Sequence, residues 1–101
     1  TQAAWRLDEA ARRLLAPDGA VIELSPTDAS VLACLLEADG ATVARDTLAQ
    51  RLGLSLSEDP NLLHATIYRL RRRIERATTA LAPLQSKSRV GYTFRAPLVR
   101  A

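Results

Sequence analysis

Residues 63–74 of the chain read LHATIYRLRRRI, and they carry the clearest helical pattern in the sequence. Its apolar residues recur at alternating steps of four and three and continue to residue 77. They are Leu63, Ile67, Leu70, Ile74 and Ala77. At about 100° per residue, such positions share one side of an α-helix. The pattern predicts a helix over about residues 60–78 that ends before Pro83, with Asp59 as its cap and Pro60 in its first turn.

The opposite side of this helix is polar and rich in arginine. It carries Asn61, Ala65, Tyr68, Arg69, Arg72 and Arg76, and its flanks carry His64, Arg71, Arg73 and Glu75. Solvated helices usually mix charges of both signs, and like charges this close repel one another, so an anionic partner would compensate them. The pattern predicts a helix that docks in the major groove of DNA and offers long donors to bases and phosphates. The alternative is an ordinary amphipathic surface helix.

The net charge of +3 is unevenly distributed along the chain. Residues 1–60 hold five arginines and ten acidic residues, whereas residues 61–101 hold eight arginines, one lysine and one glutamate. A basic half favours a polyanionic partner. Net charge alone does not distinguish a surface that binds a polyanion from a basic surface that is only solvated. The positions of the charges must distinguish the two.

Turn and cap residues divide the first forty residues into short elements. Residues 11–15 and 20–24 flank the turn-forming sequence at 17–19, Pro-Asp-Gly, and predict a hairpin, to which residues 5–7 add an earlier strand. Ser25 is a good N-cap for a first helix, with Pro26 at its first position and Asp28 completing a capping box. Gly40 is suited to end this helix in the left-handed region.

The remaining elements are a second helix and a second hairpin. After an extended segment at residues 42–43, a helix is expected over 45–52, with a weak cap at Ala44 and an end at Gly53. A polar loop follows over 54–59. Residues 84–87 and 92–95 predict a hairpin around 88–91, and its basic residues Lys87 and Arg89 suit either a second DNA contact or a plain surface turn.

Nothing in the sequence favours an enzyme. His64 is the only histidine, no His/Cys cluster has metal-ligand spacing, and no glycine-rich phosphate loop occurs. Cys34 lies in an apolar run and is expected to be a buried, unreactive thiol. No secretory signal is visible, and no apolar stretch approaches the roughly 20 residues of a membrane span. We therefore expect one cytoplasmic domain over residues 1–101, with no cofactor and no membrane contact.

Six short motifs, in order, resemble the C-terminal effector domain of response regulators of the OmpR/PhoB type. They are residues 5–8 (WRLD), 17–19 (PDG), 24–28 (LSPTD), 40–48, 63–74 and 89–94 (RVGYTF). The resemblance implies an α+β winged helix-turn-helix fold. This fold has an N-terminal antiparallel sheet of four strands, three helices and a C-terminal β-hairpin wing over about residues 85–95. It also implies transcriptional regulation, with the third helix in the major groove and the wing near the minor groove.

The resemblance also implies roles for single residues. Arg69 is the best candidate for a base contact, with His64 and Ala65 facing bases nearby. Phosphate or mixed contacts are implied for Asn61, Thr66, Tyr68, Arg71 and Arg72, and we add the basic Arg73 and Arg76. On the wing, Ser86 and Tyr92 match backbone contacts, and Lys87 or Arg89 takes the place of the usual wing arginine, because Ser88 stands at that position.

Partners follow from the same resemblance. They are double-stranded DNA, a second copy bound head to tail on direct repeats, and RNA polymerase through the loop at 53–60. A phosphorylated N-terminal receiver domain of a two-component system would lie outside this chain. Two other readings are a winged-helix protein-interaction module without specific DNA binding and an RNA-binding domain. The arginine cluster counts against the first, and the presence of only four aromatic residues counts against the second.

Overall fold

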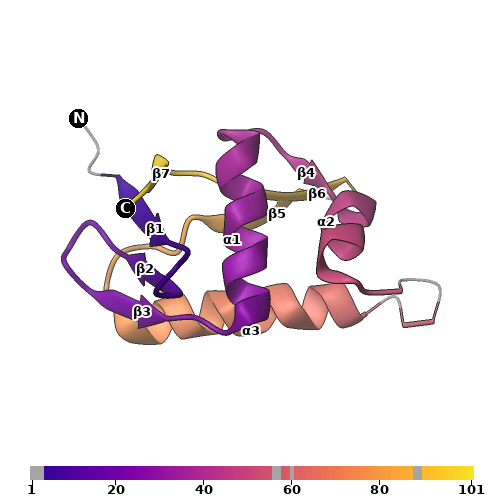
Figure 1. The fold of residues 1–101 in the computed structure, drawn as a ribbon, viewed down its shortest axis with the longest axis horizontal. Helices are drawn as coiled ribbons and strands as arrows, with labels where there is room; N and C mark the ends of the chain where they lie inside the picture. Colours follow the sequence, from indigo (N-terminus) through magenta and orange to yellow (C-terminus); the bar gives the residue numbers. More distant parts are fainter. Residues whose placement is uncertain (1–3, 56–57, 60, 88–89) are drawn as a thin grey trace.

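The computed structural model describes residues 4–55, 58–59, 61–87 and 90–101. It has three helices, α1 (Pro26–Ala38), α2 (Arg45–Leu52) and α3 (Leu62–Ala77). The strands are β1 (Trp5–Asp8), β2 (Arg13–Leu15), β3 (Val21–Glu23), β4 (Val43–Ala44), β5 (Leu84–Lys87), β6 (Gly91–Phe94) and β7 (Leu98–Arg100). In Figure 1, α1 crosses α3, with one sheet on its left and the other sheet and α2 on its right.

The first sheet has the strand order β3-β2-β1-β7. The pairs β1–β2 and β2–β3 are antiparallel, as predicted, and Leu7 lies opposite Leu14 in the register. The fourth strand, however, comes from the C-terminal end of the chain and runs parallel to β1, with Trp5 opposite Leu98. The prediction of a purely N-terminal, antiparallel sheet was therefore wrong for one of its four strands.

The β2–β3 hairpin is shorter than predicted, and its turn contacts the end of α3. Residues 11–12, which were predicted as strand, belong to a turn over residues 9–12, with Arg12 at a positive φ of 55°. In the β2–β3 turn, the Asp18 carboxylate accepts from the amide of Ala20 at 3.0 Å and from the hydroxyl of Thr78. The Thr78 bond, followed by the Ala20 bond, holds the pKa of Asp18 below its usual value, because both donors stabilise the charged form.

Helix α1 begins with the predicted capping box. The Ser25 hydroxyl accepts from the Asp28 amide at 3.1 Å, and the Asp28 carboxylate accepts from the Ser25 amide at 3.2 Å. These bonds satisfy two amides that the first turn leaves without helical partners. At the other end, the left-handed cap is Asp39, one residue before the predicted Gly40, and Gly40 also has a positive φ.

The second sheet has the order β4-β6-β5, so the predicted two-stranded wing hairpin gains a third strand. Its added strand β4 leads directly into α2, whose first residue follows Ala44 without a side-chain cap. The amide of Arg45 donates instead to the carbonyl of Val90, 3.2 Å away, in the turn before β6. Helix α2 ends at Gly53 with φ of 71°, as predicted. The wing thus supplies a backbone acceptor for the start of α2.

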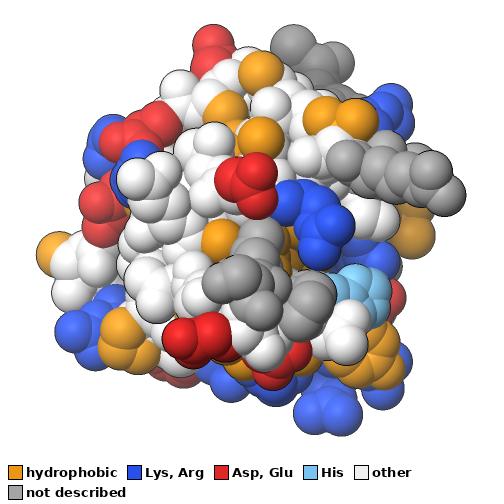
Figure 2. All heavy atoms as spheres, turned by 90° about the vertical axis from the view of Figure 1, so that its right-hand side faces the viewer, with side chains coloured by type: hydrophobic (Ala, Val, Ile, Leu, Met, Phe, Trp, Pro, Cys, Tyr) orange, Lys and Arg blue, Asp and Glu red, His pale blue; other side chains and the backbone are white. Residues whose placement is uncertain are grey.

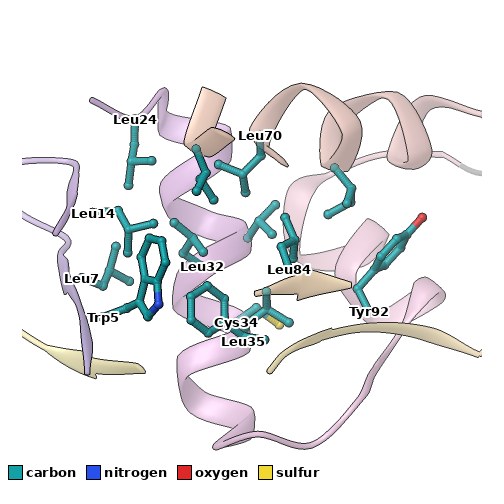
Figure 3. Packing of buried hydrophobic residues seen from close by; sticks show 14 of the residues in the cluster. Trp5, Leu7, Leu14, Leu24, Leu32, Cys34, Leu35, Leu70, Leu84 and Tyr92 are labelled. Carbon is teal, nitrogen blue, oxygen red and sulfur yellow. The ribbon is translucent and has the colours of Figure 1, made fainter. Parts of the chain in front are cut away.

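One apolar cluster joins both sheets to the helices (Figure 3). Trp5, Leu7 and Leu14 pack on one side of α1, and Leu84 and Tyr92 pack on the other. The rings of Trp5 and Phe94 meet edge to face, with centroids 5.9 Å apart. Cys34 is buried in this cluster, and burial raises the pKa of its thiol, as expected for an unreactive cysteine. No helix in the described part of the chain is long and apolar enough to cross a membrane.

Candidate nucleic-acid interface

Helix α3 begins two residues later than the sequence suggested. Its N-cap is Asn61, which makes no side-chain cap bond, and Leu62 is the first helical residue. Asp59 lies two residues before this cap, and its carboxylate accepts from the Asn61 amide at 3.1 Å in the approach to the helix. The expected role of Pro60 lies outside the described residues.

The apolar side of α3 is buried, as its spacing predicted. Leu63, Leu70 and Ile74 are fully inaccessible, and Ile67 is 3% exposed. Ala77 was wrongly included in this stripe, because it is the last helical residue and is exposed. Burial of this side fixes the rotation of α3, so the opposite side must face away from the core.

Most of the predicted polar side is open to solvent. Asn61, His64, Tyr68, Arg69, Arg72 and Arg76 are all exposed, and Ala65 is half-buried among them. Tyr68, Arg69, Arg72 and Arg76 also line a shallow depression together with Arg73. In Figure 2, Lys and Arg side chains gather along the lower margin of the molecule, the side along which α3 runs in Figure 1. The helix therefore presents an exposed strip that is cationic in its second half and contains one exposed aromatic ring. Its members are Asn61, His64, Ala65, Tyr68, Arg69, Arg72 and Arg76.

Thr66 belongs to the interior and not to this strip. Its side chain is 6% exposed, and its hydroxyl donates to the carbonyl of Leu62 at 2.9 Å, one turn earlier. A hydroxyl in this arrangement already has its partner within the helix. The predicted DNA contact of Thr66 is therefore wrong, because its hydroxyl is buried and already donates within the helix.

Arg71 points toward the wing instead of along the strip. Its Nε and Nη2 atoms donate to the carbonyl oxygen of Leu84 at 3.0 and 2.6 Å, and its side chain is half-buried. Leu84 is the first residue of β5 and is fully buried. The sequence placed Arg71 on a flank of the helix but gave no sign of this acceptor, which lies 13 residues further along the chain.

Arg73 connects α3 to the start of α1. Its Nη1 atom lies 3.1 Å from the Asp28 carboxylate and donates to the carbonyl of Glu23 at 3.3 Å. The Asp28 side chain is only 8% exposed and also forms the capping box. Arg73 therefore neutralises a buried carboxylate although its own side chain is about half exposed, whereas the equally exposed Arg72 reaches only the exposed Glu75, at 3.8 Å.

This difference gives a stability prediction. We expect Arg73→Met to lower the free energy of unfolding by about 1–2 kcal/mol, because Asp28 loses its charged partner while the apolar stem is kept. The matched control is Arg13→Met, which removes an ion pair at 3.2 Å whose two side chains are both more than half exposed. That variant should change stability by less than about 0.5 kcal/mol. Equal losses in urea unfolding would show that the buried pair is worth no more than a surface pair.

The wing residues are divided between the two faces of their sheet. Ser86 and Lys87 are exposed. Ser86 lies opposite Tyr92 in the β5–β6 pair. The ring of Tyr92 is buried, and its hydroxyl points away from the apolar cluster (Figure 3). Lys87 alternates with Ser86 and lines a groove of about 500 Å³ with Asp39 and Thr93, at the end of α1. The predicted contact at Arg89 lies outside the described residues.

Sequence reasoning assigned all five arginines of α3 to one partner, but the structure separates them. Arg71 and Arg73 bind acceptors within the domain, whereas Arg69 and Arg76 have no acidic partner within the described part of the chain. Helical periodicity finds the face of a residue, but not an acceptor contributed by a distant segment. The backbone of Val90, which caps α2, was missed for the same reason. Across the described residues, no group of His, Cys, Asp or Glu side chains could hold a metal ion.

A family model described as "Transcriptional regulatory protein, C terminal" matches residues 19–94. The chain belongs to this family. Its members are the C-terminal DNA-binding domains of transcriptional regulators of the OmpR/PhoB type, so the family predicted from the motifs is confirmed. No match is found among curated protein sequences.

Solved DNA-binding domains share the fold of this family member. The AdeR domain, in complex with an intercistronic region, has a TM-score of 0.76 at 13% identity, covering 96% of this chain and 99% of that one. The Klebsiella pneumoniae RstA domain, in complex with the RstA box, has a TM-score of 0.73 at 22% identity and 93% coverage of both chains. The E. coli CpxR domain has a TM-score of 0.71 at 24% identity, covering 97% and 92%. The predicted winged helix-turn-helix architecture is confirmed.

Proposed function

We propose that this domain binds double-stranded DNA in a sequence-dependent manner and thereby regulates transcription. Helix α3 enters the major groove by its exposed strip, and the β5–β6 wing approaches the neighbouring minor groove. The observation that carries the proposal is that the strip is continuous and cationic, while the buried side of the same helix is fixed in the core. Such a helix can dock without reorganising and offers arginines both to base edges and to phosphates.

Within this strip we assign separate roles. Arg69 reads a base edge, because it is exposed near the middle of α3 and has no acidic partner in the described part of the chain. His64 and Ala65 lie one turn closer to the helix start and face the bases nearby. Asn61, Tyr68, Arg72 and Arg76 contact phosphate or sugar, as do Ser86, Lys87, Arg89 and the hydroxyl of Tyr92 on the wing side. Arg71 and Arg73 are assigned to the domain itself.

The wider assembly is proposed on family resemblance alone. Two copies would bind head to tail on a direct repeat, the loop at 53–60 would contact RNA polymerase, and a receiver domain in a longer regulator would control the binding. The cationic strip also has no evident use in a winged-helix module that binds only protein.

The deciding experiment is selection of bound duplexes from a random-sequence pool at two salt concentrations. Enrichment of a short motif, with affinity that falls steeply as salt rises, would establish a domain that reads sequence and would reveal its site. A repeated motif would support the head-to-tail pair. Salt-dependent binding without enrichment would remove base reading from the proposal. Absence of binding at low salt would overturn it in favour of the protein-interaction reading.

Replacing Arg69 tests base reading directly. We expect Arg69→Ala to weaken binding to the selected site by about 1–3 kcal/mol, the range for loss of a bidentate base contact. The loss on random DNA should be smaller. Arg6→Ala is the control, because Arg6 is an exposed arginine in β1, which β2 separates from β3, the strand of that sheet reached by Arg73 of α3. Equal losses on both DNAs would leave Arg69 as a phosphate contact only.

A further inference from the structure

The seam between α3 and the wing contains one feature that the roles above leave unused. Arg71 places two N–H donors on a single backbone oxygen, that of Leu84. Among the described residues, these are the only hydrogen bonds between a side chain of α3 and the wing strands. Arg71 also lines the groove along this seam together with Leu84 and Ser86. With two of its donors on the Leu84 carbonyl, the Arg71 guanidinium is not free to turn toward a DNA phosphate.

The Leu84 carbonyl needs such a donor because of its place in the sheet. Strand β5 is an edge strand, since the order is β4-β6-β5. The carbonyls of Pro83 and Lys87 point to the hairpin partner, where they accept from Arg95 and Val90 at 2.8 and 3.0 Å. By strand alternation, the carbonyl of Leu84 points out of the free edge. The residue is fully buried, so this oxygen has little access to water, and an unpaired carbonyl there would be costly.

The same bond fixes the position of the wing relative to α3. Leu84 begins β5, and Ser86 and Lys87 follow in the same strand. At the far end of the hairpin, the Val90 carbonyl accepts from the first amide of α2. The hairpin is therefore attached at its base to α3 by Arg71 and near its tip to α2. These two attachments act together with the β4–β6 pairing and the buried wing residues of the core, and Arg71 is the one that joins β5 to α3 by a side-chain hydrogen bond.

We propose that Arg71 is a positioning residue for the wing: it holds β5 against α3 and sets the offset at which helix and wing grip DNA together. Its contribution to DNA affinity then passes through the wing and not through a phosphate contact of its own. This inference rests on the proposed DNA-binding function, but its structural half can be tested without DNA.

The first measurement is hydrogen exchange of the free domain. Arg71→Gln should accelerate exchange of the amides of β5 and β6 by about tenfold, as expected for loss of a charge-assisted hydrogen bond. Amides in the middle of α3 should exchange as before. Arg72→Gln is the matched control, because Arg72 is the next residue and is exposed, and it should leave wing exchange unchanged. Unchanged wing exchange in the Arg71 variant would overturn the proposal, whatever the DNA result.

The second measurement is a double-mutant cycle on a short mixed-sequence duplex. Lys87→Gln weakens the wing contact, and in that background Arg71→Gln should cost much less than the roughly tenfold loss of affinity expected when the wing is intact. Arg72→Gln should instead add its full effect in both backgrounds and lower the salt slope by about 0.9. Full additivity of Arg71→Gln with Lys87→Gln, with the same drop in slope, would make Arg71 a phosphate contact and overturn the proposal.

Arg71→Lys covers the case in which the glutamine variant does not fold. Lysine keeps the charge but lacks the planar fork that places two donors on one oxygen. It should accelerate wing exchange and lower affinity while the salt slope stays close to that of the parent. Affinity fully preserved despite a loosened wing would refute the coupling. If the parent domain does not bind DNA, the proposed function fails, and the exchange data alone still decide whether Arg71 holds the wing.

Discussion

Replacing Leu70 with alanine is expected to lower the free energy of unfolding by about 2–5 kcal/mol. The side chain of Leu70 is fully inaccessible and lies where α3 packs against α1 (Figure 3). Alanine would leave a cavity that the surrounding residues fill only partly, so the lost contacts add to the lost burial. Urea unfolding followed by the fluorescence of Trp5, the single buried tryptophan, measures this loss.

Leu81→Ala is the control for Leu70→Ala. It makes the same chemical change at a leucine that is 92% exposed, and it should change stability by less than about 0.5 kcal/mol. A small loss in the Leu70 variant would mean that the apolar side of α3 does not carry the packing assigned to it. The rotation of α3, and with it the exposed strip, would then lose its structural basis. The DNA-binding proposal depends on this result as much as on any binding measurement.

Local sequence signals predicted the helices well, because the forces that form them act within a few residues. The capping box of Ser25 and Asp28 was read from a spacing of three and is present in the structure. Gly53 ends α2 with a positive φ, as a glycine after the last periodic residue suggested. The apolar side of α3 was read from its period and is buried from Leu63 to Ile74. Errors in these elements amount to one or two residues at their ends.

Strand pairing between distant segments could not be predicted in the same way. Strand β7 has only three residues and follows Pro97, and it pairs with a strand more than ninety residues earlier. Strand β4 has two residues, and only its pairing with β6 makes it a strand. Neither segment is long enough to show an alternating pattern. These strands exist because the core brings their partners close, and sequence reasoning saw only that residues 42–43 were extended.

The arginines illustrate the same limit at the candidate interface. Periodicity correctly placed Arg69, Arg72 and Arg76 on the exposed side. Arg71 was assigned to DNA by the family resemblance and Arg73 because it is basic, and neither assignment could take acceptors from other segments into account. Their acceptors are contributed by β5, β3 and the start of α1, which are distant in the sequence. Charge density alone therefore does not show which arginines already have partners within the domain.

Gly91→Ala is expected to destabilise the domain more than alanine at any of the other three glycines, because only at Gly91 would the added methyl group collide with other atoms. A β-carbon at residue 91 would lie 1.9 Å from the carbonyl oxygen of Val43 and 2.7 Å from its carbon. Both are backbone atoms of β4, which pairs with β6 at this point, so no side chain can turn away to make room. We expect a loss of about 3 kcal/mol or more, at or above the upper end for overpacking, or separation of β4 from β6.

Gly19→Ala separates this clash from backbone strain. Gly19 has a φ of +91° and open space around its β-position, so its substitution adds strain without a collision. That variant should lose only about 1 kcal/mol. The readouts are urea unfolding and the hydrogen exchange of the Arg45 amide, which donates to Val90 beside Gly91. A Gly91 variant no less stable than the Gly19 variant, with the Arg45 amide still protected, would mean that the carbonyl oxygen of Val43 in β4 lies farther than 1.9 Å from the β-position of Gly91. If the clash is confirmed, the glycine of the wing motif serves the close approach of β4, which keeps the wing and α2 in the relative positions that DNA binding by this domain requires.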